Sequence, residues 1–210
     1  MYSRRQFLNM AGGAAVVIPA AVPLAGIAGR NAAAAELSED GLHVQDWFVD
    51  SFLDLTEDHA TAAAEGRHFA VIIEQRGCPY CRDTHEINFA HPKVREYIPA
   101  NFDMLQLNLH GSRMVTDFDG EELEERELAR KWLVNFTPTI VFFPIDAAAV
   151  EGKSGRDAEA ARLPGYFRPF TFMQMFKFVH EEKFVDSTFQ RYLAERVAEM
   201  DAQGLDPAAW

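Results

Sequence analysis

The alternation of apolar and polar positions predicts a regular series of helices and strands. Apolar side chains recur at three- and four-residue steps over residues 42–65, which predicts an amphipathic helix that ends at a Gly-Arg pair. A continuous apolar run over residues 68–75 predicts a buried strand, and the next stretch, residues 79–90, predicts a helix. A His-Pro pair ends that helix, and residues 93–98 add another one or two helical turns.

The second half of the chain continues this alternation. The elements predicted there are a strand over residues 104–109, a helix over 121–134, a strand over 136–144, its partner strand over 158–163, a helix over 170–182 and an amphipathic helix over 186–203. Strands that alternate with helices, followed by a hairpin and a closing helix, indicate the α/β class. We therefore expect a mixed central sheet flanked by helices, with helical extensions at both the N-terminal and the C-terminal end.

Residues 1–35 have the layout of an export signal. Arg4 and Arg5 form a twin-arginine pattern, an uncharged stretch rich in alanine and glycine follows, and small residues then offer a cleavage site. An uncleaved membrane anchor is the alternative, but the prolines and glycines make the stretch only mildly apolar. We expect a cleaved signal and a periplasmic protein. Residues 36–210 then form one domain with its core over about 66–182.

The overall charge narrows the class of partner. The chain has 20 Lys and Arg against 32 Asp and Glu residues, a formal net charge of −12. An acidic surface disfavours nucleic-acid binding, which requires clusters of basic residues that neutralise phosphates. No other segment is long and apolar enough to span a bilayer, so we expect no membrane span after signal cleavage. We further expect a monomer.

The only two cysteines, Cys78 and Cys81, are separated by two residues at the junction of the predicted strand and the predicted helix. The start of a helix carries a partial positive charge and free N–H groups, which stabilise a thiolate on the first cysteine. A disulfide across two residues closes so small a loop that it hardly restricts the unfolded chain. The spacing therefore favours a redox-active disulfide over a structural one, with no further cofactor.

The order of the elements, the Cys-x-x-Cys pair and Thr137-Pro138 at the start of a later strand together resemble the thioredoxin fold. The resemblance implies that Pro138 is cis and faces the disulfide, and that Thr137 offers backbone hydrogen bonds to a substrate chain. The alternative is an ordinary trans proline at the start of a strand. Pro79 suits the first helical turn, where no N–H partner is needed, and Tyr80 offers an aromatic flank for substrate.

More narrowly, residues 68–143 resemble the SoxW-type periplasmic thioredoxins. The strings that carry the resemblance are Glu-Gln-Arg-Gly-Cys-Pro-Tyr-Cys at 74–81, His-Glu-Ile-Asn-Phe at 85–89 and Ala-Arg-Lys-Trp-Leu-Val-Asn-Phe-Thr-Pro-Thr at 129–139. Proteins of this type belong with the sulfur-oxidising system of bacteria that use thiosulfate. The resemblance implies that the chain reduces disulfides of periplasmic partner proteins and receives electrons from a membrane thiol transporter.

The resemblance also assigns roles to the two cysteines. Cys78 is expected to attack a target disulfide, and Cys81 to resolve the mixed disulfide. Thioredoxins usually carry a buried acid six residues before the first cysteine, but Ile72 occupies that position here. Glu74 lies on the same strand face and is a candidate for proton transfer, although it could equally reach solvent at the strand end. His85, one helical turn after Cys81, is a second candidate, unless it only covers the helix.

Three alternatives remain open at the level of the sequence. A thiol oxidase or isomerase of the DsbA type would use the same cysteines in the opposite direction. A non-catalytic metal carrier would bind zinc or copper through Cys78, Cys81 and His85, with His91 or His110 as a fourth ligand, although no second ligand pair is present. Residues 111–125 contain Asp-Phe-Asp-Gly, which suggests calcium, but their spacing favours an exposed hairpin.

Overall fold

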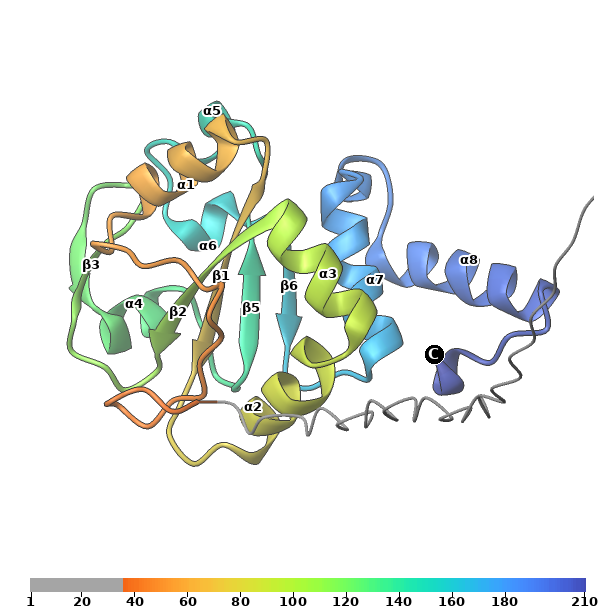
Figure 1. The fold of residues 1–210 in the computed structure, drawn as a ribbon. Helices are drawn as coiled ribbons and strands as arrows, with labels where there is room; N and C mark the ends of the chain where they lie inside the picture. The colour runs from red at the N-terminus through yellow and green to blue at the C-terminus, as the bar shows by residue number, and fades with distance from the viewer. Residues whose placement is uncertain (1–35) are drawn as a thin grey trace, which may run out of the picture. The chain divides into compact units, whose positions relative to one another are not determined.

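A four-stranded mixed sheet forms the core of residues 36–210, the part of the chain that the computed structural model describes (Figure 1). The strand order is β2–β1–β5–β6. β1 (His68–Glu74) pairs in parallel with β2 (Phe102–Asn108) and antiparallel with β5 (Thr139–Phe142). β6 (Ala161–Pro164) pairs antiparallel with β5 and completes the sheet. The predicted export signal, residues 1–35, lies outside the described residues.

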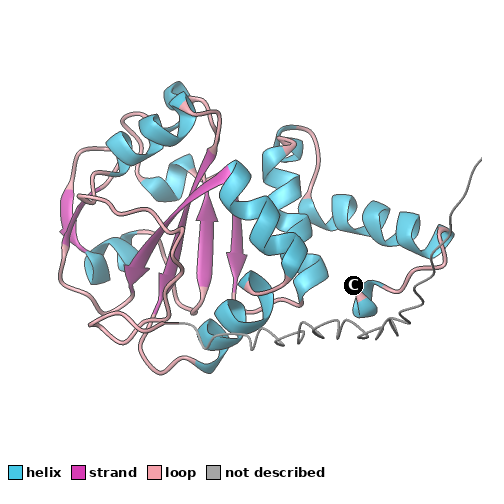
Figure 2. Cartoon of the chain, in the orientation of Figure 1, coloured by secondary structure: helices cyan, strands magenta, loops and turns pink. Residues whose placement is uncertain are grey.

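Helices cover the sheet on both faces (Figure 2). The helices are α1 (Leu55–Ala64), α2 (Pro79–Asp83), the π-helix η1 (Thr84–Phe89), α3 (Pro92–Asn101), α4 (Glu125–Lys131), α5 (Ala147–Val150), α6 (Gly155–Ala158), α7 (Pro169–His180), the 3₁₀ turn η2 (Lys183–Val185), α8 (Phe189–Ala202) and the 3₁₀ turn η3 (Pro207–Ala209). The predicted mixed α/β class and the C-terminal amphipathic helix are confirmed. Within residues 36–210, no helix combines the length and the apolar character needed to cross a membrane.

Strand β1 is buried along its whole length because both faces of the sheet are covered. Successive side chains point to opposite faces, so Phe69, Val71 and Ile73 enter one core with α1 and α4. Ala70 and Ile72 enter the second core with α3 and α7. The same alternation places Glu74, the last residue of β1, on the same face as Ala70 and Ile72. The helix that follows the cysteines covers this face.

The helix predicted over residues 42–65 is wrong in its first half. Residues 36–54 form an irregular segment, here called the strap, and α1 begins only at Leu55, where the Asp54 side chain accepts the N–H groups of the first turn. Leu53 has a φ of 67°, which a continuous helix does not allow. Trp47 and Phe48 of the strap pack edge-on against Phe89. Tertiary packing therefore explains the apolar spacing that resembled a helix.

The helix predicted over residues 121–134 is also wrong at its beginning. Glu122–Glu124 forms β4, which pairs antiparallel with β3 (Met114–Thr116) in a separate two-stranded sheet. The predicted hairpin is therefore present, but it is not simply a solvated loop. Val115, Asp117 and Phe118 are buried, so the hairpin is attached to the body of the domain.

Asp117 connects the hairpin to two other parts of the chain, the end of α4 and the start of α6. Its carboxylate accepts hydrogen bonds from the indole N–H of Trp132 (3.1 Å) and from the backbone N–H of Gly155 (2.9 Å), and it lies 2.9 Å from Lys131 Nζ. A buried carboxylate is tolerated only when it is paired and hydrogen-bonded, and these partners meet that requirement. Asp119, the second acid of the Asp-x-Asp-Gly string, lies 2.7 Å from the same Lys131 Nζ.

The Asp117→Ala substitution should therefore destabilise the domain. Removal of the carboxylate leaves three buried donors without a partner, the indole N–H of Trp132 and the backbone N–H groups of Phe118 and Gly155, and we expect a loss of about 3 kcal/mol in the free energy of unfolding. Urea unfolding followed by circular dichroism would measure the loss. Asp119→Ala on the same hairpin is the matched control, because Asp119 pairs with Lys131 at the surface and should cost less than about 1 kcal/mol. Equal losses in the two variants would contradict this account of the hairpin.

Candidate active site

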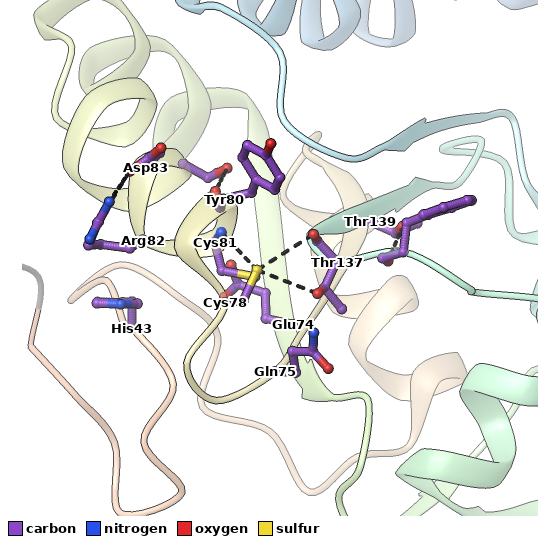
Figure 3. The surroundings of a disulfide bond; sticks show 12 residues. His43, Glu74, Gln75, Cys78, Tyr80, Cys81, Arg82, Asp83, Thr137 and Thr139 are labelled. Atoms are coloured by element: carbon purple, nitrogen blue, oxygen red, sulfur yellow. Dashed lines mark hydrogen bonds and ion pairs between the residues drawn. A yellow bond between two sulfur atoms is a disulfide. The ribbon is translucent and has the colours of Figure 1, made fainter.

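The two cysteines form a disulfide where strand β1 leads into helix α2 (Figure 3). Their Cα atoms are 5.2 Å apart. Cys78 is the N-cap residue of α2, and Pro79 occupies the first helical turn as expected from its missing N–H group. Both cysteines are buried, with 6% of Cys78 and 2% of Cys81 exposed, so Cys78 lies nearer to solvent.

The Cys78 sulfur lies among groups that stabilise negative charge. The backbone N–H of Cys81 donates to Cys78 Sγ over 3.1 Å, and the Thr137 hydroxyl donates to it over 3.4 Å. The Thr137 carbonyl oxygen lies 3.5 Å from the same sulfur, and the Thr137–Pro138 peptide bond is cis, as the resemblance implied. A thiolate formed at Cys78 would therefore have two donors already in position.

Exposed aromatic side chains border the disulfide. Tyr80 is 58% exposed and stacks on Tyr166 with the ring centroids 6.3 Å apart. Phe136, directly before Thr137, is 68% exposed. Burial raises the pKa of the Tyr166 hydroxyl, and the nearby charge of Asp83 adds to the rise. The stacked tyrosine rings thus present aromatic surface at the start of α2, which suits contact with a polypeptide substrate.

Glu74 is buried in the surroundings of the disulfide (Figure 3). Only 1% of the residue is exposed, so the alternative in which Glu74 reaches solvent at the strand end is wrong. Its Oε2 atom accepts a hydrogen bond from Gln106 Nε2 over 2.6 Å and lies 3.0 Å from His85 Nε2. Its Oε1 atom is buried and has no hydrogen-bond partner within the described residues. One carboxylate oxygen, Oε2, therefore has two hydrogen-bond partners, and the other, Oε1, has none among the described residues.

His85 is the residue that the π-helix η1 brings to Glu74. It is 1% exposed and reaches the carboxylate across the gap between helix and sheet. Its Nδ1 atom lies 3.0 Å from Gln45 Nε2 of the strap. His85 is thus a buried residue whose two ring nitrogens both lie within hydrogen-bond distance of a neighbouring side chain. π-Helical turns shift the side chains that follow them and are frequent at functional sites.

Three residues of this cluster were not predicted from the sequence. Gln106 lies on the inward face of β2 beside Ile72, and its amide also donates to the His43 carbonyl oxygen over 2.6 Å. A polar residue at an inward position of an alternating strand is a signal that could have identified Gln106. Gln45 and His43 belong to the irregular strap, and no spacing in the sequence indicates that they approach the disulfide.

The ligand set considered for metal binding is not assembled in residues 36–210. Within that range, no group of three or more His, Cys, Asp or Glu side chains is arranged to hold a metal ion. His85 is paired with Glu74, whereas His91 stacks on Trp210 with the ring centroids 4.6 Å apart. His110 Nε2 lies 3.0 Å from Gln75 Oε1 at the surface. The histidines therefore have other partners.

Several solved structures are similar to this chain. A thioredoxin-fold protein from Helicobacter pylori is 20% identical, with 70% of this chain and 92% of that chain covered and a TM-score of 0.46. A thioredoxin from Thermus thermophilus is 27% identical, with 59% and 82% covered and a TM-score of 0.45. The oxidised C-terminal domain of Neisseria meningitidis DsbD is 12% identical, with 63% and 97% covered and a TM-score of 0.42.

A match to a protein-family model identifies the family of the chain, and the Cys78–Cys81 site is consistent with that family. Comparison with curated proteins found no match. The thioredoxin-like domain family matches residues 55–180, which is more than half of the 210 residues. The fold and the Cys78–Cys81 disulfide support thiol–disulfide oxidoreductase chemistry in general. The chain belongs to the thioredoxin-like family.

Proposed function

We propose that the protein is a periplasmic thiol–disulfide oxidoreductase of the SoxW type, which reduces disulfides of partner proteins by dithiol exchange. The observation that carries this proposal is the setting of Cys78, whose sulfur caps helix α2 and accepts the N–H of Cys81 and the hydroxyl of Thr137. These groups favour a thiolate over a neutral thiol, and the thiolate is the nucleophile of disulfide exchange.

The exchange begins with the dithiol form of the protein. The Cys78 thiolate attacks one sulfur of the target disulfide, and the other target sulfur leaves as a thiolate and takes a proton from solvent. Cys81 then loses its proton and attacks Cys78, so that the Cys78–Cys81 disulfide forms, and the second target sulfur leaves as a thiolate and also takes up a proton from solvent. The target gains two electrons and two protons, and the protein loses both. A reductant must restore the dithiol, and the membrane thiol transporter is the proposed donor.

The substrate chain is proposed to lie along the Thr137 side of the disulfide. The Thr137 carbonyl oxygen lies beside the Cys78 sulfur, where an extended chain could donate an N–H to it while its own sulfur reacts. Tyr80 and Phe136 flank this position with exposed aromatic surface. Aromatic side chains contribute much contact area with few rotatable bonds, which suits a site that must accept different partner sequences.

Glu74 is proposed to take the proton of Cys81 during resolution. The carboxylate lies in the surroundings of the disulfide and is shielded from bulk water (Figure 3). Its Oε2 atom keeps two partners while the unpartnered Oε1 atom can receive a proton. His85 acts in this proposal by holding the carboxylate in place, because its ring nitrogen is already engaged with Oε2.

The location and the donor rest on the sequence. Arg4, Arg5 and the uncharged stretch that follows support export by the twin-arginine route. An oxidising compartment requires a supply of electrons from the membrane if a reductase is to act there. The SoxW-type resemblance supplies the proposed target class, which is cysteine-containing proteins of the sulfur-oxidation system.

The Cys81→Ser variant should accumulate a mixed disulfide with its target. Attack by Cys78 remains possible, but the second thiolate that would release the target is missing, so steady-state turnover falls to background. Non-reducing gels of periplasmic extract, followed by mass spectrometry of the trapped species, would check this outcome. Cys78→Ser is the matched control and should trap nothing, because the nucleophile itself is gone. Absence of any trapped species in Cys81→Ser would contradict the exchange mechanism.

The Glu74→Gln variant should slow resolution more than attack. A symmetrical nitrobenzoate disulfide reports both steps, since attack by Cys78 releases one coloured thiolate and resolution by Cys81 releases the second. A neutral amide cannot accept the Cys81 proton, so we expect the second phase to slow roughly 100-fold while the first phase changes little. Glu86→Gln, on the exposed side of η1, is the control and should leave both phases unchanged. Equal slowing of both phases would contradict a role specific to Cys81.

The direction of electron flow is tested by the redox potential. A reductase should have a potential near that of thioredoxin, about −270 mV, when the protein is equilibrated with glutathione buffers and its free thiols are counted. A value near about −120 mV would instead identify an oxidase of the DsbA type, whose dithiol form is the more stable one. Such a value would overturn the proposed direction and leave the exchange chemistry in place.

A further inference from the structure

The strap, residues 36–54, reaches the surroundings of the disulfide from outside the region that matches the thioredoxin-like family, which begins at residue 55. Two hydrogen bonds attach it to the edge strand β2, one from the backbone of the strap and one from the side chain of Gln106. The N–H of Val49 donates to the Met104 carbonyl oxygen over 2.9 Å, and the Gln106 amide donates to the His43 carbonyl oxygen over 2.6 Å. The strap therefore has a defined position beside Glu74, and its side chains can take part in the chemistry there.

Gln45 is the strap residue that contacts the buried pair directly. Its Nε2 atom lies 3.0 Å from His85 Nδ1, on the side of the imidazole ring opposite to Glu74. With the amide in this orientation its nitrogen donates, so Nδ1 is the accepting nitrogen of the ring. The proton of a neutral imidazole must then reside on Nε2, which faces the Glu74 carboxylate.

This tautomer decides what Glu74 can do. With a proton on His85 Nε2, the Oε2 atom of Glu74 accepts from both His85 and Gln106 and carries no proton of its own. The proton that arrives during resolution must bind to Oε1, the buried oxygen without a partner in the described residues. In the other tautomer, the bare Nε2 atom would need a donor, and a protonated Glu74 would supply it and would no longer act as a base.

We propose that Gln45 is a positioning residue that fixes the Nε2–H tautomer of His85 and thereby keeps Glu74 ready to take the proton of Cys81. The strap is then a functional part of the redox centre. This inference rests on the proposed function, because it concerns the resolving step of disulfide exchange. The proton passes from Cys81 Sγ to Glu74 Oε1 as the new sulfur–sulfur bond forms, and it later returns to solvent.

Apolar packing by the same strap supports this role. Phe48 lies edge-on to the His85 ring with a centroid separation of 5.7 Å, and both Phe48 and Trp47 lie edge-on to Phe89. His85 itself is 1% exposed, and hydrogen bonds to a buried group are stronger because water competes less for it. His43 is a further titratable group beside the pair, with its ring centroid 5.7 Å from that of His85.

The first test measures the His85 tautomer in the full chain by nitrogen NMR, which separates the two neutral forms by the chemical shifts of the ring nitrogens. We expect the Nε2–H form in the native protein and a mixture of forms in Gln45→Met, which keeps the length of the side chain but has no donor. In Gln45→Glu the ring lies between two carboxylates, so His85 should carry a proton on both ring nitrogens. A native protein with the Nδ1–H form would overturn the proposal without any variant.

The second test measures the two phases of thiolate release from the nitrobenzoate disulfide. We expect Gln45→Met to slow the second phase about five-fold, as loss of one hydrogen bond implies, with the first phase unchanged. Asp46→Asn, an exposed change at the next position of the strap, is the control and should leave both phases and the tautomer unchanged. Circular dichroism would confirm that the variants are folded, and Gln45→Leu, which also lacks a donor, provides the same comparison if Gln45→Met does not fold.

The outcomes separate this inference from the proposed function. A native protein that releases neither thiolate would contradict the proposed exchange chemistry itself. A native protein with both phases, together with a Gln45→Met variant that keeps the native tautomer and the native second phase, would overturn the role of Gln45 alone. A slower second phase with an unchanged tautomer would also overturn it, because the strap would then act only through packing.

Discussion

The buried carboxylate of Glu74 is the constraint on which the arrangement around the disulfide depends. An acidic group removed from water is stable only when its oxygens are hydrogen-bonded or when it takes up a proton. His85 and Gln106 satisfy one oxygen, and they come from the π-helix η1 and from β2. Gln106 in turn contacts the strap at His43, and His85 contacts it at Gln45. A single acidic residue at the end of β1 thus requires the helix, the neighbouring strand and the strap to meet at one place.

The same constraint explains two irregular features of the backbone. The first is the π-helical segment η1, which follows α2 and holds His85 and Phe89 on the buried side. The second is the strap, which has the apolar spacing of a helix but does not form one. Its backbone is hydrogen-bonded instead to Met104 and to the Gln106 side chain at the edge of the sheet. Both irregularities lie within contact of the Glu74–His85 pair. Irregular backbone that is held in place by several contacts commonly marks a functional site.

Much of the fold and the reactive pair could be predicted from the sequence because they depend on local pattern. The apolar run of β1, the Cys-x-x-Cys spacing and Thr137-Pro138 each lie within a few residues, and the structure places Thr137 against Cys78. The strap could not be predicted, because the spacing of Trp47 and Phe48 is that of a helix and only their packing on Phe89 shows otherwise. Gln45 could not be predicted either, because its partner His85 lies 40 residues away in the chain and no local pattern connects them.

The displacement of the acid along β1 has a physical consequence for the redox centre. Thioredoxins usually carry this acid six residues before the first cysteine, whereas Ile72 occupies that position here and Glu74 follows two residues later. Two residues of extended strand move the carboxylate by about 6.6 Å toward the cysteines on the same face. A negative charge so near the sulfur atoms would oppose thiolate formation if it were unshielded. Donation from His85 and Gln106 to Oε2 draws that charge away from the disulfide. The closer acid therefore requires His85 and Gln106 as hydrogen-bond donors. Gln45, on the other side of the imidazole ring, is needed so that the His85 nitrogen that faces Glu74 is the one that carries the proton.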